Sequence, residues 1–228
     1  MTPAHLFFIP TVFFLGLFAG GMVASFYRSA SPVGAESGSV HGQTSAKALL
    51  IAFVVFASVF VATHMSPQFG GAKAISVATH GMPILDQRPS LSSDDVYRRL
   101  DAFGMAGRDM YQRFTYSSDV GFPLTLLVFL SLLAKFVAQR SVLSRQWSRA
   151  LVVLPFVWFA SDMLENAIVY SLLSHFPTRN EILGGMVGFV TVAKFGLLLL
   201  SIAVPAVCLL VLKKGLNQSD QTFNFYNR

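Results

Sequence analysis

Residues 150–175 read ALVVLPFVWFASDMLENAIVYSLLSH, and this stretch decides the fold. About 20 predominantly apolar residues suffice for an α-helix to cross a bilayer. The run is long enough for this, although Asp162, Glu165 and Asn166 lie near its middle. Their spacing of i, i+3 and i+4 places them on one face of a helix. Because unpaired carboxyl and amide groups are costly in hydrocarbon, we expect this face to contact protein or water.

The composition is that of an integral membrane protein. Of the 228 residues, 54% are hydrophobic and 12% are charged, whereas soluble domains average about 25% charged residues. The single cysteine, Cys208, excludes an intrachain disulfide and a CxxC pair. The net charge of +6 comes largely from short basic segments between hydrophobic runs. We therefore expect the positions of these basic segments to indicate which loops face the cytoplasm, and we expect no nucleic-acid partner.

Five hydrophobic runs predict an all-α, polytopic membrane bundle with five transmembrane helices. The runs cover residues 6–27, 46–63, 120–138, 150–175 and 183–212. A cleaved signal peptide is the alternative for the first run, but no Lys or Arg precedes it and it exceeds the usual length. The domains are then an N-terminal helix (1–28), a flexible Ser/Gly/Ala-rich linker (29–45), a four-helix module (46–214) and a polar tail (215–228).

The module contains one large polar segment, residues 65–118. Ser92 and Ser93 followed by two aspartates predict a helix start with a hydroxyl cap. Apolar residues then recur at helical spacing as far as Phe114, with a break near Gly104 or Gly107. We expect an amphipathic helix that lies on the membrane surface or caps the bundle; a helix packed on its neighbours in a soluble loop is the alternative.

Charge predicts the orientation of the chain. The segments around residues 28–47, 135–149 and 213–228 are basic, whereas 65–118 balances six basic residues against five aspartates. Five spans place the basic segments on one side, which the positive-inside tendency makes cytoplasmic. We therefore expect the N-terminus and residues 65–118 outside, the C-terminus in the cytoplasm, and the bacterial inner membrane as the location.

The fifth run carries Lys194, about eleven residues from its start. The loop before it is short, so we expect this helix to run antiparallel to the helix of residues 150–175. Lys194 then lies at a depth in the membrane close to that of Glu165 and Asn166. This predicts a lysine–carboxylate pair, with the second carboxyl protonated or hydrogen-bonded. Asp119 lies near the start of the third run, where helix capping alone would explain it. The candidate ligand-binding or proton-carrying residues are Asp162, Glu165, Asn166, Lys194 and Asp119.

Several enzyme classes lack their motifs in this sequence. It has no GxSxG elbow, HExxH zinc helix or glycine-rich phosphate loop. The five histidines are scattered, so we expect no metal site and no cofactor, and we assign no catalytic residue. A membrane enzyme that uses one carboxyl as a general acid or base stays open.

Besides the enzyme, three roles compete for the intramembrane polar residues, and a fourth possibility concerns the whole chain. They are a structural network, a site for a lipid, sterol, quinone or other hydrophobic ligand, a proton or cation relay that uses Asp162 and Glu165, and an accessory subunit of a larger complex. A partner subunit would bind through the small-residue pairs Gly16/Gly20 or Gly184/Gly188. We favour a non-enzymatic role in ligand binding or assembly.

Several segments resemble a group of small multi-pass bacterial membrane proteins without established function. They are YSSDVGFPL (116–124) and SDMLENAIVY (161–170), with DQRP (86–89), YRRLDAFGMAGRDMYQRF (97–114) and TVAKF (191–195). The resemblance covers residues 86–200. It implies a four-helix module with the five candidate residues at its polar positions, and it implies no reaction.

Overall fold

The computed structural model describes residues 44–65, 71–141 and 143–226, with side chains as far as residue 211. Every regular element in these residues is a helix, as the sequence predicts. The predicted helix at 6–27, with Gly16 and Gly20, lies outside the described residues, as does most of the linker 29–45. Residues 44–228 form one compact unit, which contains the predicted four-helix module.

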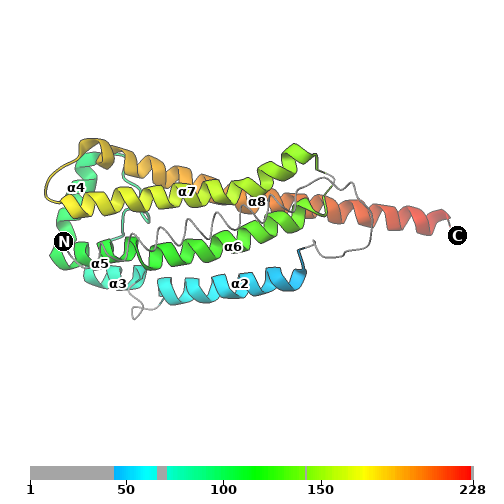
Figure 1. The fold of residues 1–228 in the computed structure, drawn as a ribbon, viewed down its shortest axis with the longest axis horizontal. Coiled ribbons are helices and arrows are strands. Elements are labelled where there is room, and N and C mark those ends of the chain that lie inside the picture. Colours follow the sequence, from blue (N-terminus) through cyan, green and yellow to red (C-terminus); the bar gives the residue numbers. More distant parts are fainter. Residues whose placement is uncertain (1–43, 66–70, 142, 227–228) are drawn as a thin grey trace, which may run out of the picture. The chain divides into compact units, whose positions relative to one another are not determined.

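Four helical segments are long and apolar enough to cross a membrane, at Ala46–Met65, Gly104–Ala138, Arg145–His175 and Glu181–Val211. The first comprises α2 (Ala46–Phe60) and a π-helical turn, η1 (Val61–Met65). The others contain α6 (Ser118–Ala138), α7 (Arg145–His175) and α8 (Glu181–Tyr226) (Figure 1). The structure thus agrees with four of the five predicted spans, and α8 continues through most of the predicted polar tail.

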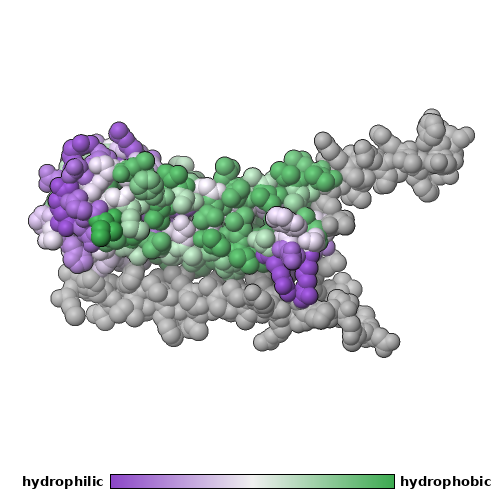
Figure 2. Space-filling view, turned by 90° about the horizontal axis from the view of Figure 1, so that it is seen from above, coloured by the Kyte–Doolittle hydropathy of each residue, from purple (hydrophilic) through white to green (hydrophobic). Residues whose placement is uncertain are grey.

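The long helices pack side by side. Helix α6 contacts α2, α7 and α8, and α7 contacts α8 along its length (Figure 1). The connection between α7 and α8 is short, so the two helices run antiparallel, as predicted. Between the polar ends of the bundle, the coloured part of the face shown in Figure 2 is predominantly apolar. Leu199 and Leu210, for example, are 66% and 63% exposed, which suits contact with lipid.

Three shorter helices close one end of the bundle, and we call residues 71–117 the cap. They are α3 (Ala72–Ala78), which the sequence did not predict, α4 (Ser93–Ala102) and α5 (Gly104–Thr115). The predicted amphipathic helix breaks between α4 and α5, where Gly104 has φ +65°, a conformation that glycine adopts at little cost. Ser92 occupies the predicted N-cap position, but its side chain makes no capping hydrogen bond.

The cap packs on the ends of α7 and α8 that extend past α6. Helix α4 contacts α8, and α5 contacts α7. Leu100, Phe114 and Leu172 are at most 1% exposed in the shared core. Helix α6 has 21 residues, a length of about 31 Å, which matches a hydrocarbon core of about 30 Å. The cap therefore packs on parts of α7 and α8 that lie past the start of α6, the helix whose own length matches the hydrocarbon core.

Candidate functional site

The predicted polar cluster forms where α7 contacts α8. Asp162, Glu165 and Asn166 share a buried face of α7, and each is at most 6% exposed. Lys194 Nζ of α8 lies 3.0 Å from Asp162 Oδ1 and forms a second ion pair with Glu165 Oε2. Thr191, one turn before Lys194, donates its hydroxyl hydrogen to the other oxygen of Glu165. The predicted lysine–carboxylate pair is confirmed, and both α7 carboxyl groups take part.

The cap supplies a further carboxylate that the sequence analysis did not assign to the site. Asp86 Oδ2, in the connection between α3 and α4, lies 4.0 Å from Lys194 Nζ. Arg99 of α4 holds this connection by donating to three backbone carbonyls of residues 83–88, at 2.5–2.9 Å. The Tyr111 hydroxyl accepts a hydrogen bond of 3.2 Å from the N–H of Leu85. These contacts fix the backbone on both sides of Asp86.

Partial burial lowers the pKa of the Arg99 guanidinium, and the nearby charge of Asp95 opposes this change. The ordinary pKa of arginine lies far above neutrality, so Arg99 stays charged. Hydrogen bonds from a charged donor are stronger than those between neutral groups, so the charge of Arg99 strengthens its hydrogen bonds to the three backbone carbonyls. Arg99 is therefore the residue that positions the Asp86 connection.

Asn166 joins the cluster to the first turn of α6. Its Nδ2 donates a 2.9 Å hydrogen bond to the backbone carbonyl of Asp119. In a regular helix that carbonyl would accept from the N–H four residues later, but residue 123 is proline and has none. The side chain of Asn166 replaces the missing donor. The cluster therefore lies level with the start of α6, and the position of Asp119 reflects this contact as well as its place at a helix N-terminus.

We expect Asn166→Leu to lower the free energy of unfolding by about 1–3 kcal/mol, because it leaves the buried Asp119 carbonyl without a donor. Pro123→Ala restores a backbone N–H at the right place, so adding it to Asn166→Leu should recover most of the loss. Thermal unfolding in detergent of the parent, both single variants and the double variant measures this coupling. Additive effects of the two substitutions would contradict the assignment.

The cluster contains more acidic than basic groups. We use the name carboxylate cluster for Asp86, Asp119, Asp162 and Glu165, with Lys194 as the cation that three of them contact. Asp119 is 8% exposed and interacts electrostatically with Asp86, Asp162 and Lys194. Asp162 Oδ2 and Asp86 Oδ1 are buried and have no hydrogen-bond partner among the described residues. Since uncompensated buried charge is costly, the cluster needs protons, water or a cationic group in addition to Lys194.

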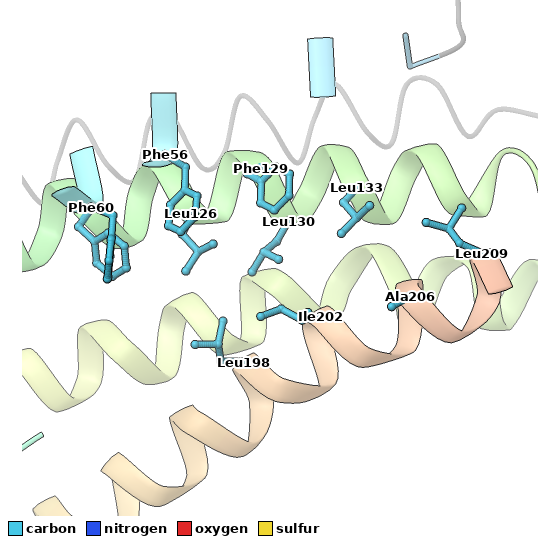
Figure 3. Close-up of a pocket in the computed structure, with 11 residues that line it drawn as sticks. Phe56, Phe60, Leu126, Phe129, Leu130, Leu133, Leu198, Ile202, Ala206 and Leu209 are labelled. Carbon is cyan, nitrogen blue, oxygen red and sulfur yellow. The ribbon is translucent and has the colours of Figure 1, made fainter. Parts of the chain in front are cut away.

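An apolar groove of about 390 Å³ lies between α2, α6 and α8 and is partly open to the surroundings (Figure 3). Only apolar atoms line it, and its volume falls in the range of small-molecule sites. Its lining residues are Phe56 and Phe60 of α2, Phe122, Leu126, Phe129, Leu130 and Leu133 of α6, and Leu198, Ile202, Ala206 and Leu209 of α8.

The groove continues the helix faces that carry the charged residues. On α6, Asp119 is followed at helical spacing by the groove residues Phe122 and Leu126. On α8, Lys194 is followed at spacings of four and eight by Leu198 and Ile202. Residues three or four apart lie on the same face of a helix. Asp119 and Lys194 therefore lie at one end of the stripes that line the groove.

His64 lies at the same end of the groove, in η1, which continues α2. It follows the groove residues Phe56 and Phe60 at spacings of eight and four. Its ring stacks on Phe60, with centroids 4.6 Å apart, and meets Phe122 edge-on at 4.7 Å. Its Nδ1 shares a hydrogen bond of 2.8 Å with the Thr63 hydroxyl. We call His64, Asp119 and Lys194 together the polar end of the groove.

The small-residue pair Gly184/Gly188 packs within the chain. A Cβ atom on Gly184 would lie 2.5 Å from Ser93 Oγ, and one on Gly188 would lie 2.0 Å from the carbonyl oxygen of Ser90. The segment that leads into α4 therefore covers this face of α8. We assign the pair to the seam between α8 and the cap, which leaves it without a free surface for a partner subunit.

Comparison with known proteins gives no relative: no family model, curated protein or solved structure matches the chain. The resemblance described from YSSDVGFPL and SDMLENAIVY stays a prediction. All five residues assigned from the sequence nevertheless meet at one place in the fold, where Asp86 and Thr191 join them.

Proposed function

We propose that this chain is an integral membrane protein that binds an amphiphilic ligand, with the ligand's apolar tail in the groove and its head at the polar end. One observation carries the proposal. Each of the three helices that line the groove has a polar side chain, His64, Asp119 or Lys194, at the same end of its lining stripe. A long apolar cleft with a few polar groups at one end is the expected shape of such a site.

The dimensions of the groove fit a lipid tail. On α8 its lining runs from Leu198 to Leu209, which is about 16 Å of helix. Half of a bilayer's hydrocarbon core is about 15 Å thick. Asp119 lies in the first turn of α6, so the polar end lies close to the boundary of the membrane-spanning length. A ligand with its head at this level would extend its tail through one leaflet.

Charge supports an orientation for the site. Arg140, Arg145 and Arg149 lie around the connection between α6 and α7, at the end of the bundle opposite the cap. The positive-inside tendency makes that end cytoplasmic. The cap and the polar end of the groove would then face outward, and the ligand would enter from the outer leaflet. We propose the bacterial inner membrane as the location and a non-enzymatic role.

A proton relay is the second candidate, because Asp162 Oδ2 and Asp86 Oδ1 are buried without hydrogen-bond partners among the described residues. A relay also needs a polar route to the other side of the membrane. Between the cluster and the opposite end of the bundle, Ser131 and Ser201 are the buried polar side chains of the described residues. Two separated hydroxyl groups make a poor route, which favours ligand binding.

Filling the groove tests the proposed function. Ala206 lines it, so Ala206→Phe should occupy the space of the ligand tail. Val207, the next residue, is 57% exposed and does not line the groove, which makes Val207→Phe the matched control. A membrane lipid extract that contains the ligand at a hundredfold excess over its Kd should raise the unfolding temperature of the parent by about 5–10 °C.

We expect Val207→Phe to keep this stabilisation and Ala206→Phe to lose most of it, while both variants without extract unfold close to the parent. Thermal unfolding in detergent, with and without extract, gives all six values. Two results would contradict the proposal. One is equal stabilisation of Ala206→Phe and the parent. The other is a large destabilisation of Ala206→Phe without extract and no response of the parent, which would mean that protein already fills the groove.

A further inference from the structure

The charge of the carboxylate cluster indicates which kind of head group the site accepts. Lys194 already pairs with Asp162 and Glu165, and Asp86 Oδ2 lies 4.0 Å from the same amine. Its positive charge is therefore taken up by protein carboxylates. Asp119 adds a further acid, so the acids outnumber this cation by three.

Two unpaired oxygen atoms support the same conclusion independently of the count. The side chain of Asp162 is 6% exposed, and its Oδ2 has no hydrogen-bond donor among the described residues. Asp86 Oδ1 is likewise buried without a partner among them. A buried carboxylate oxygen needs a donor, and a charged donor gives the stronger bond. Both atoms thus leave acceptor positions for which the described part of the chain supplies no donor.

We infer that the ligand is a long-chain amine or another amphiphile with a cationic, hydrogen-bond-donating head. The head would bind Asp119 at the polar end of the groove, together with Asp86 and Asp162, which lie beside Lys194. This inference rests on the proposed function. An anionic head, such as a phosphate or sulfate, brings no N–H donor to the two unpaired oxygen atoms and is repelled by every carboxylate among them that is ionised. A neutral alcohol has one O–H group, so it can donate to only one of the two unpaired oxygen atoms.

Three probes with the same tail test this inference. They are photoreactive hexadecylamine, hexadecanol and hexadecyl sulfate, added to the full chain in phosphatidylcholine nanodiscs at pH 7, where the amine is protonated. Labelling is measured against probe concentration, corrected for partition into empty nanodiscs, and mapped to peptides by mass spectrometry. We expect the amine to label the groove with a Kd about tenfold below that of the alcohol, and the sulfate to show no saturable labelling.

Asp119→Asn removes one surplus charge at the polar end and keeps the shape of the side chain. It should reduce the preference for the amine over the alcohol to about threefold or less, with the Kd of the alcohol unchanged. Asp86→Asn should also reduce the preference for the amine. The Asp86 side chain is 21% exposed, so this variant replaces Asp119→Asn in the experiment if Asp119→Asn fails to fold. A purely structural role of either aspartate would weaken all saturable labelling by the same factor.

The outcomes separate the inference from the proposed function. Equal binding of amine and alcohol would overturn the cationic head and leave the groove as an amphiphile site. Stronger binding of the sulfate would also overturn it and would point to an anionic lipid. If no probe labels the groove of the parent in a saturable way, both the proposed function and the inference fail.

Discussion

Lys194→Met should lower the free energy of unfolding by about 3–5 kcal/mol, because removing one partner of a buried ion pair leaves the other charge uncompensated. Methionine is shorter than lysine by only the terminal atom, so little packing is lost. The Nζ atom, however, is the shared cation of Asp162 and Glu165, with Asp86 close by. Thermal unfolding of the full chain in detergent should show a fall on the order of 10 °C.

The control for this prediction neutralises the acids as well. Lys194→Met combined with Asp162→Asn and Glu165→Gln removes the buried charges on both sides of the pair, and it should be markedly more stable than Lys194→Met alone. Lys73→Met, at an exposed site on α3, should leave the unfolding temperature within about 2 °C of the parent. If Lys194→Met behaves like Lys73→Met, the ion pairs do not hold α8 against α7.

Gly188→Ala is the second substitution with a large expected effect. The new methyl group would lie 2.0 Å from the Ser90 carbonyl oxygen and 2.6 Å from its carbon, so backbone has to move. Overpacking of this kind costs about 3 kcal/mol, and the cap should separate from α8. Gly184→Ala meets mainly the Ser93 hydroxyl, a side chain that can rotate, and its effect should be smaller.

Gly196→Ala, on the same helix, is the matched control for the glycine prediction. Nothing lies within 4 Å of a Cβ atom at this position, and alanine favours a helix by about 1 kcal/mol over glycine. We expect it to unfold at or above the temperature of the parent. Unfolding temperatures for the three glycine variants provide the comparison. A tolerated Gly188→Ala would mean that the segment at Ser90 does not press on α8.

Much of the site could be predicted from the sequence because helical spacing is a local property. The i, i+3 and i+4 spacing of Asp162, Glu165 and Asn166 places them on one face, and a short connection makes α8 an antiparallel neighbour. The depth of Lys194 then follows from counting residues. The predicted pair required no knowledge of the remaining fold, and the structure confirms it.

Asp86 and the groove could not be predicted in the same way. Asp86 reaches Lys194 because Arg99 and Tyr111 hold its connection, and these contacts join segments 11 to 26 residues apart. The groove depends on how α2, α6 and α8 pack, which periodicity does not specify. Nor could the sequence decide between the two uses of Gly184 and Gly188, since close helix packing within a chain and between chains requires the same small residues.

The central claim is that the groove and its polar end form one amphiphile site, and native mass spectrometry of the full chain released from nanodiscs tests it most directly. The account predicts that the parent and Val207→Phe retain a bound amphiphile from a membrane extract, seen as a discrete added mass, and that Ala206→Phe loses it. A parent without any retained mass, or an Ala206→Phe variant that retains the same mass to the same extent, would contradict the account.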